Sequence, residues 1–380
     1  MIPIKYISAG FDSSGYAAAA RGYIACLLET GQVDVTCEIV SFEAQKTTHG
    51  VLGELIKPLL DKPLQHKIQI IHLTPDNFPR FVRQDKYNIG YCAWETSKLP
   101  DPWPTYCNMM DELWVPSDYN INVFRNSGVT KPIYKILHGI EKLDLVGITP
   151  MEIGNPNTFT FYSIFQWIER KNPICLLKAY LTEFASGEDV NLVLKSYRLN
   201  TSPEEQEVIK SHVKAIKKAL NLTTYPAITF YGGLFTREQI ISLHMRGNCF
   251  VLPVRNEGFG ITQAEAMMFG KPVISSNYGG VLEFMNEKNS FLIKTHESPV
   301  YGMLFPNYNA HMLWGEPDVM DLRRLMRYVF DERNVSDVAA LAAQGQQDVE
   351  RLLNWKKIGQ DMLERLNTIN SSLGKVSKMF

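Results

Sequence analysis

The sequence lacks any apolar run of about 18–20 residues, the length that a membrane-spanning helix needs. It also lacks a signal-peptide pattern, because its first residues, MIPIKYISAGFDSS, start directly on a strand-like run. The two absences predict a cytoplasmic protein with no stable membrane insertion.

Neither sign of charge is in excess, since 39 Lys and Arg residues face 40 Asp and Glu residues. The net charge of −1 provides no global field for holding nucleic acid or an anionic membrane, although a local basic cleft stays open. The six cysteines contain no C-x-x-C pair, which argues against a zinc site and against a disulfide framework. We expect buried thiols in a reducing cytosol.

Two common nucleotide-binding signatures are missing. The loop AGFDSSGYAAAAR follows the first strand-like run, but it is neither G-x-G-x-x-G nor a P-loop, because Tyr16 and Ala17 replace Lys and Ser or Thr. A P-loop ATPase is therefore disfavoured. No D-x-D pair or His/Asp cluster falls at the end of a strand-like run, so we expect no metal ion.

Short apolar runs alternate with helical patterns along the chain. Such alternation is typical of βαβ units and a parallel sheet. A segment rich in Gly, Pro and Asn, GIEKLDLVGITPMEIGNPNT, separates two sets of runs and is typical of a linker. The runs lie at residues 4–8, 35–42, 68–73, 87–94, 112–117 and 133–138, and then at 158–165, 190–197, 227–233, 248–254 and 272–276.

Two glutamates, Glu257 and Glu265, flank a glycine bend in the stretch RNEGFGITQAEAMMFGKPVISSNYGG. Thr262 and Glu265 fit the capping box T-x-x-E, so the pattern predicts a strand, the bend NEGFG and a short helix. Free N–H groups at such a helix N-terminus favour an anion. Capping alone accounts for Glu265. Glu257 fits a ligand with hydroxyls, such as a sugar, or else a solvated loop acid.

Positive charge is predicted at the same edge of the sheet. Lys195 lies near the end of the strand VNLVLKSY, and Arg170 and Lys171 follow the strand TFTFYSIF. Because the carboxyl ends of parallel strands share one edge, these cations and the glycine bend converge, and together they suit a diphosphate. Taken alone, each cation fits an ordinary surface residue. An aromatic stretch at residues 295–317 fits either a functional loop or a packed flap.

Together these motifs resemble the retaining family 4 glycosyltransferases of the GT-B fold, within the group 1 glycosyl transferases. The likeness depends on the E-x7-E spacing of Glu257 and Glu265, EGFG, EAMMFGKPVISSNYGG, the RKNP turn and Lys195, over about residues 155–290. In the first half, NIGYCAWETSKLPDPW, ELWVPSDYN and HGIE look like a bacterial and phage-type branch of that group.

The resemblance implies an α/β chain in which two Rossmann-like domains with parallel sheets face each other across a cleft. Residues 1–150 would form the acceptor-side domain, joined by a C-terminal helix at about 354–380, and residues 151–353 the donor domain. The implied reaction moves a sugar from a UDP- or GDP-linked donor to an acceptor hydroxyl with retention, without a metal or other cofactor. The acceptor stays open among a saccharide, a glycolipid, a protein and a modified base.

Carried over to this chain, the resemblance implies roles for the matching residues. Lys171 and Lys195 bind the donor diphosphate, Glu257 binds hydroxyls of the transferred sugar, and Glu265 binds the ribose. Further donor contacts are implied for the bend and for two other loops: Gly258, Phe259, Gly260, Ile261 and Thr262, then Gly233 and Phe235, then Ser14 and Gly15.

The chain departs from the family pattern in two places. Gln166 and Trp167 stand where relatives carry an arginine before the RKNP-type lysine, so Arg170 becomes a candidate for the diphosphate. AWETS stands where relatives have a histidine that reaches the donor sugar, so Glu95 becomes the candidate there. A sugar-nucleotide epimerase or a non-catalytic nucleotide-sugar-binding subunit would share the same fold.

Overall fold

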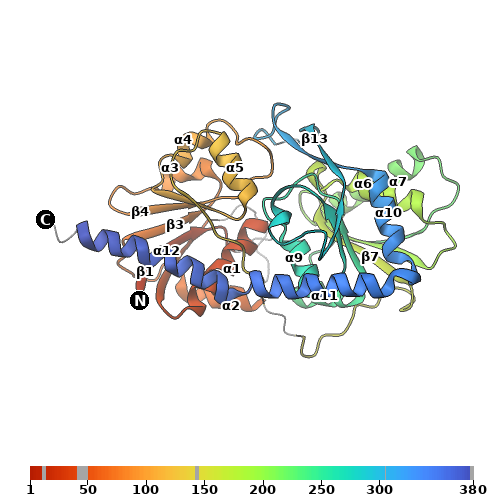
Figure 1. Cartoon of the computed structure of the whole chain (residues 1–380), viewed down its shortest axis with the longest axis horizontal. Coiled ribbons are helices and arrows are strands. Elements are labelled where there is room, and N and C mark those ends of the chain that lie inside the picture. The colour runs from red at the N-terminus through yellow and green to blue at the C-terminus, as the bar shows by residue number, and fades with distance from the viewer. Residues whose placement is uncertain (11–13, 41–49, 142–144, 304, 377–380) are drawn as a thin grey trace. The chain divides into compact units, whose positions relative to one another are not determined.

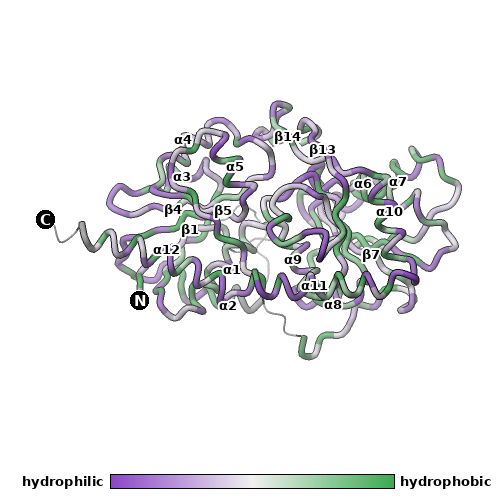
Figure 2. The backbone as a smooth tube through the Cα atoms, viewed as in Figure 1, coloured by the Kyte–Doolittle hydropathy of each residue, from purple (hydrophilic) through white to green (hydrophobic). Residues whose placement is uncertain are grey.

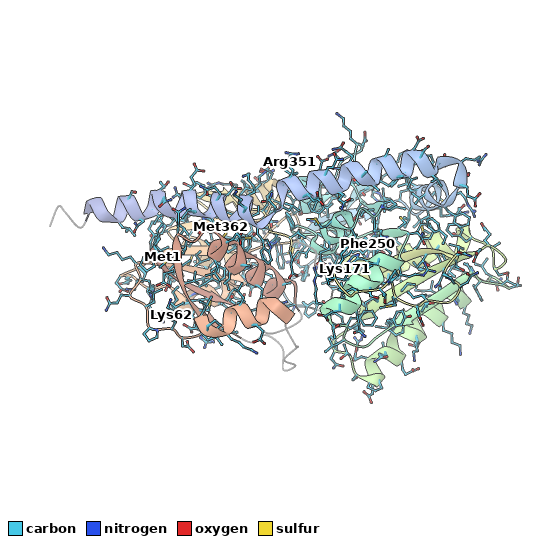
Figure 3. The ribbon with its side chains drawn as sticks, turned by 90° about the horizontal axis from the view of Figure 1, so that it is seen from below. Met1, Lys62, Lys171, Phe250, Arg351 and Met362 are labelled. Atoms are coloured by element: carbon cyan, nitrogen blue, oxygen red, sulfur yellow. The ribbon has the colours of Figure 1, made fainter. Side chains whose placement is uncertain are left out.

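The computed structural model describes residues 1–10, 14–40, 50–141, 145–303 and 305–376 (Figure 1). The chain divides into two compact units. The first unit comprises Met1–Trp94, Lys98–Leu143 and Leu352–Phe380, and the second comprises Glu95–Ser97 and Asp144–Arg351. The chain returns from the second unit to the first after Arg351, and Met362 lies on the helix that follows (Figure 3).

The first unit is built on a parallel sheet with the strand order β2-β1-β3-β4-β5-β6. Its inner strands β3 and β5 are buried along their whole length, as expected where helices cover both faces of a parallel sheet. The strands are β1 (Ile2–Ser8), β2 (Val33–Ile39), β3 (Ile68–His72), β4 (Tyr87–Tyr91), β5 (Glu112–Val115) and β6 (Ile133–Lys135). The helices are α1 (Gly15–Glu29), α2 (Gly50–Ile56), α3 (Phe78–Phe81), α4 (Trp103–Cys107), α5 (Asp118–Asn126) and α12 (Trp355–Val376).

Helix α12 packs against α1 within the first unit. The close approach depends on Gly359, since a Cβ added there would lie 2.2 Å from the carbonyl oxygen of Cys26. Among the described helices, none combines the length and the apolar character that crossing a membrane requires. All six cysteines are buried as free thiols, as the missing C-x-x-C pair predicts.

The second unit is built on a parallel sheet with the order β12-β11-β10-β7-β8-β9 and carries a separate antiparallel pair, β13-β14. The strands are β7 (Phe159–Gln166), β8 (Val190–Tyr197), β9 (Ala227–Tyr231), β10 (Cys249–Leu252), β11 (Val273–Ser276), β12 (Phe291–Ile293), β13 (Thr295–Pro299) and β14 (Leu313–Pro317). The helices are α6 (Pro173–Glu183), α7 (Pro203–Ala219), α8 (Arg237–Arg246), α9 (Ile261–Met268), α10 (Val319–Phe330) and α11 (Val335–Leu352).

The core of the second unit lies along β7, β8 and β10. Phe161, Tyr162 and Phe250 are fully buried there, and Phe250 is labelled in Figure 3. The backbone of β7 is mostly hydrophobic (Figure 2). Helices α7, α6 and α10 lie side by side in one layer beside the sheet. The predicted α/β class with two parallel sheets is therefore confirmed.

Candidate functional site

The sheet of the second unit has one point at which its strand order reverses. The chain runs outward from β7 to β8 and β9, and then returns to the other side of β7 with β10. Ligands of open α/β sheets bind at the carboxyl ends of the strands at such a point. The segments that leave β7 and β10 there carry Arg170, Lys171 and Glu257, three of the residues predicted from the sequence.

Both cations bind the carboxylate of Glu257. Arg170 Nη1 donates to Glu257 Oε2 at 2.8 Å, and Lys171 Nζ pairs with Glu257 Oε1. Arg170 Nη1 also donates to the carbonyl oxygen of Asn256 at 2.8 Å. Only 8% of Glu257 is exposed, so this is a buried ion-pair cluster and excludes a solvated loop acid.

The RKNP turn positions the two cations. Residues Glu169–Lys171 form one 3₁₀ turn, and Asn172 follows in the left-handed region with φ 54°. The Asn172 side chain accepts from the Cys175 backbone N–H at 3.2 Å and so caps α6, which starts at Pro173. Asparagine tolerates that conformation and proline suits the first helical position, so the motif fixes how the cations leave β7.

The Gly279–Gly280 pair at the end of the motif supports the glycine bend. The backbone N–H of Gly280 donates to the Glu257 carbonyl at 2.8 Å. A Cβ on Gly280 would lie 2.0 Å from the Gly258 carbonyl oxygen, and a Cβ on Gly279 would lie 1.6 Å from Asn256 Oδ1. The close backbone contact therefore requires both glycines, and it fixes the loop that carries Glu257.

The predicted capping box at Thr262 and Glu265 is wrong. Helix α9 begins at Ile261 behind an N-cap glycine, Gly260, whose φ is 103°, so Thr262 is already inside the first turn. The capping residue has no side chain, and the Glu265 carboxylate instead accepts from Arg237 Nη1 at 2.7 Å. Glu265 is thus explained by an ion pair between α9 and α8, and not by helix capping.

Lys195 differs from the other two cations. The strand register places it between Ile164 of β7 and Tyr231 of β9, and only 6% of the residue is exposed. Its ammonium lies 5.1 Å from the ring centroid of Phe235, but it has no ion-pair or hydrogen-bond partner among the residues that the structure describes. Burial lowers the pKa of Lys195 to about 8. A buried cation without a counter-ion favours an anionic ligand.

The charges of the cluster shift one another's protonation. Burial alone would raise the pKa of Glu257, but Lys171 and Arg170 outweigh it and keep that pKa below its ordinary value. Burial lowers the pKa of Lys171 although Glu257 opposes the change, while Glu95 and Glu257 raise the pKa of Arg170 against its burial. Glu257 is therefore an anion at neutral pH.

Glu95 joins the same cluster. Its segment, Glu95–Ser97, belongs to the second unit although the chain on both sides of it belongs to the first. Glu95 Oε1 lies 3.2 Å from Arg170 Nη2, and Glu95 Oε2 accepts from the Tyr308 hydroxyl at 3.1 Å. Sequence reasoning missed Tyr308, for which the aromatic stretch before β14 was the available signal.

Of the other predicted contacts, Phe235 lies beside Lys195, whereas Ser14 and Gly15 lie in the first unit. Ser14 and Gly15 open α1 in the first unit, where Ser14 Oγ accepts from the Ala17 backbone N–H at 3.1 Å. Gly233 is exposed and Phe235 is half-buried in the loop after β9. Their roles toward a donor stay predictions. Within the described ranges, no group of three or more His, Cys, Asp or Glu residues is placed to hold a metal ion.

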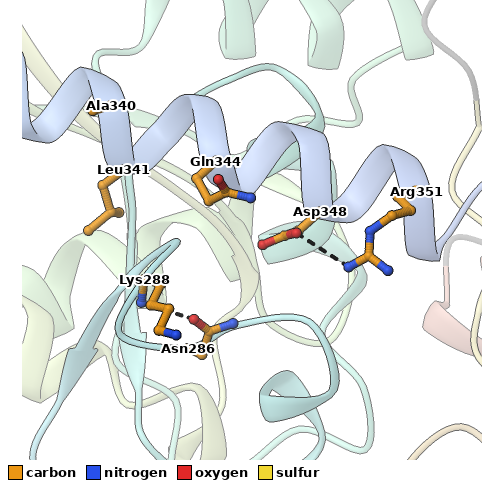
Figure 4. A pocket seen from close by; sticks show the side chains of 7 residues that line it. All are labelled: Asn286, Lys288, Ala340, Leu341, Gln344, Asp348 and Arg351. Carbon is orange, nitrogen blue, oxygen red and sulfur yellow. Dashed lines mark hydrogen bonds and ion pairs between the residues drawn. The ribbon is translucent and has the colours of Figure 1, made fainter.

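A surface pocket of about 670 Å³ lies elsewhere in the second unit, between α11 and the loop before β12 (Figure 4). Asp348 accepts there from Arg351 and from Asn289. None of the predicted site residues lines it, so we assign it no role in the site. It is lined by Asn286, Lys288, Ala340, Leu341, Gln344, Asp348 and Arg351.

Residues 155–303 match the family model described as Glycosyl transferases group 1. Uncharacterized protein 356 of Sulfolobus islandicus rod-shaped virus 1 is 20% identical over 267 residues, which are 66% of this chain and 71% of that protein. Mannosylfructose-phosphate synthase of Agrobacterium fabrum is 25% identical over 161 residues, 42% of this chain but only 30% of the synthase.

Solved structures extend the likeness to the whole chain. HepE of Anabaena, in complex with UDP and glucose, has a TM-score of 0.65 at 15% identity and covers 97% of this chain and 100% of its own. Sucrose-phosphate synthase of Thermosynechococcus elongatus has a TM-score of 0.67 at 16% identity, covering 98% and 100%. The fold is therefore GT-B, and residues 155–303 in the second unit match a group 1 glycosyl transferase domain.

Proposed function

We propose that this glycosyltransferase transfers a sugar from a UDP- or GDP-linked donor to an acceptor hydroxyl, with retention and without a metal ion. The observation that carries the proposal is Lys195, a buried cation to which none of the described residues supplies a counter-ion, at the same sheet edge as the Arg170–Lys171–Glu257 cluster. HepE has been solved in complex with UDP and glucose, and in complex with UDP-glucose. We therefore choose UDP and UDP-glucose as the first probes.

The donor diphosphate would meet Lys195 and Lys171. In the ligand-free chain Lys171 pairs with Glu257, so binding exchanges that partner for a phosphate oxygen. The N-terminus of α9 at Ile261 adds the backbone N–H groups of its first turn and the positive end of the helix dipole. Two cations and a helix N-terminus together suit a doubly charged diphosphate.

Glu257 would then bind the hydroxyls of the transferred sugar. Once Lys171 turns to the phosphate, Oε1 of Glu257 is free to accept, while Oε2 stays bound to Arg170. Glu265 would bind the ribose, in exchange for its present partner Arg237. Glu257 orients the sugar in this scheme and is not the nucleophile.

Retention follows if the departing phosphate takes the acceptor's proton on the face from which it leaves. Inversion instead needs a side chain that deprotonates the acceptor on the opposite face. The cations and the helix N-terminus would stabilise the growing charge of the phosphate. An anomeric-proton NMR spectrum of the product tests this directly: an α-linked donor should give an α-linked product, and a β-linked product would refute retention.

Calorimetry with UDP-glucose and GDP-mannose, followed by turnover assays on a panel of acceptors, tests the function. Lys195→Met should abolish most of the diphosphate affinity, whereas Lys210→Met, an exposed lysine paired with Glu207 on α7, should not change it. Binding without transfer to any acceptor would favour a non-catalytic subunit. Formation of an isomeric sugar nucleotide without an acceptor would favour an epimerase.

A further inference from the structure

We infer that Glu95 and Tyr308 are positioning residues that set the place of Glu257 by acting through Arg170. The inference rests on the proposed function, because it assumes that Glu257 binds the donor sugar. It also assigns a role to the stretch between β13 and β14, which the sequence left open between a functional loop and a packed flap.

The evidence is a continuous chain of polar contacts. The Tyr308 hydroxyl donates to Glu95 Oε2 at 3.1 Å, and Glu95 Oε1 lies 3.2 Å from Arg170 Nη2. Arg170 Nη1 donates to Glu257 Oε2 at 2.8 Å. In this series of contacts, each carboxylate oxygen and each terminal guanidinium nitrogen has its own partner. A displacement of the Tyr308 hydroxyl would therefore be passed on to the carboxylate of Glu257.

The terminal nitrogens of the Arg170 guanidinium are bound by other groups of the protein. Nη1 is bound to Glu257 and to the Asn256 carbonyl, Nη2 is bound to Glu95, and Nε is buried with no partner among the described residues. Both terminal nitrogens therefore already have partners, and the Tyr308 hydroxyl contacts the guanidinium as well. The geometry therefore favours a positioning role over the predicted diphosphate contact, which falls to Lys171 and Lys195.

The segment that carries Glu95 is fixed to β14 by two hydrogen bonds. The Ser97 backbone N–H donates to the Leu313 carbonyl at 2.8 Å, and the Leu313 backbone N–H donates to Ser97 Oγ at 2.8 Å. On the other side of the pair, the Arg255 guanidinium lies 5.0 Å from the ring centroid of Trp314 and pairs with Glu316. Arg255 lies two positions before Glu257, so the β13-β14 pair is attached to both ends of the polar chain.

The charges show why the arrangement matters. Arg170 is shared between two carboxylates, and a planar guanidinium released by one can turn to bind the other with two parallel hydrogen bonds. Without Glu95, Arg170 would engage both oxygens of Glu257, including the oxygen that should accept from the sugar. The loss would affect the sugar moiety of the donor and leave the nucleoside diphosphate moiety unaffected.

The test uses the full chain with UDP, UDP-glucose, GDP and GDP-mannose as probes. Calorimetry would measure the affinity of wild type, Tyr308→Phe, Glu95→Gln and the double variant, and steady-state assays would separate kcat from KM. The matched control is Tyr301→Phe, because Tyr301 lies in the same connection and is 82% exposed. Thermal melting of every variant checks folding, and Tyr308→Phe removes a single oxygen atom.

Each variant should lower the affinity for the nucleotide sugar by about three- to tenfold, the size of one hydrogen bond, and should lower kcat. The affinity for the nucleoside diphosphate should stay unchanged. The double variant should lose less than the sum of the two single losses, because both side chains act through Arg170. Tyr301→Phe should match wild type.

Three outcomes would overturn the inference while the proposed function stands: unchanged nucleotide-sugar affinity in both variants, an equal loss for nucleotide sugar and nucleoside diphosphate, or additive losses in the double variant. If Tyr308→Phe fails to fold, the affinity ratio of Glu95→Gln decides between these results in the same way. Wild-type protein that binds none of the four probes would overturn both the proposed function and this inference.

Discussion

Donor binding should be coupled to proton uptake by Lys195. Burial lowers the pKa of Lys195 to about 8, and none of the described residues supplies a counter-ion, so the protein without donor should start to lose this proton near neutral pH. A bound diphosphate supplies the missing negative charge and should restore the pKa toward its ordinary value of about 10.4. Above neutral pH, the protein must therefore take up a proton in order to bind the donor.

The size of the effect follows from the two pKa values. With about 8 in the free state and about 10.4 in the complex, UDP-glucose affinity should fall about fourfold between about pH 6.5 and about pH 8.5. That change corresponds to about 0.8 kcal/mol. Uptake should be about 0.75 proton per donor at about pH 8.5, compared with about 0.1 at about pH 7.

Calorimetry in buffers of different ionisation enthalpy measures this uptake directly. The difference between wild type and Lys195→Met isolates the lysine from titration of the nucleotide base. Without donor, the lowered pKa of Lys195 also affects folding. The unfolded chain binds more protons than the folded protein between about pH 8 and about pH 10, so the free energy of unfolding should rise with pH there. Equal proton uptake by wild type and Lys195→Met at about pH 8.5 would refute the assignment of Lys195 to the diphosphate.

Three other changes have defined outcomes. Gly280→Ala should cost about 1–3 kcal/mol of stability and most of the donor affinity, because its Cβ would lie 2.0 Å from the Gly258 carbonyl oxygen. The control is Gly187→Ala, whose Cβ would lie in open space, and equal melting temperatures for the two variants would contradict this reasoning. Glu265→Gln should weaken UDP about tenfold or more and leave pyrophosphate, which has no ribose, unchanged; an equal loss for both would assign Glu265 only to its ion pair with Arg237. Chelation with EDTA should leave transfer intact, and loss of activity that manganese or magnesium restores would reveal a metal site.

The sequence predicted those parts of the fold that depend on local pattern. Each apolar run became a strand, and the RKNP turn and the glycine bend emerged at one sheet edge, because strand direction alone decides that placement. The capping box failed because Gly260 supplies the N-cap through its backbone conformation, which a side-chain motif does not report. The contact of Tyr308 with Glu95 joins residues 213 positions apart, and no local periodicity encodes such a pair.

The return of α12 to the first unit has a consequence for biosynthesis. Helix α1 needs α12 to cover the face where Gly359 meets Cys26, yet the ribosome makes the whole second unit before it reaches α12. At ordinary translation rates, about 20–60 s pass between the synthesis of α1 and the synthesis of α12. The second unit should therefore reach a protease-resistant state on the ribosome before the first unit does.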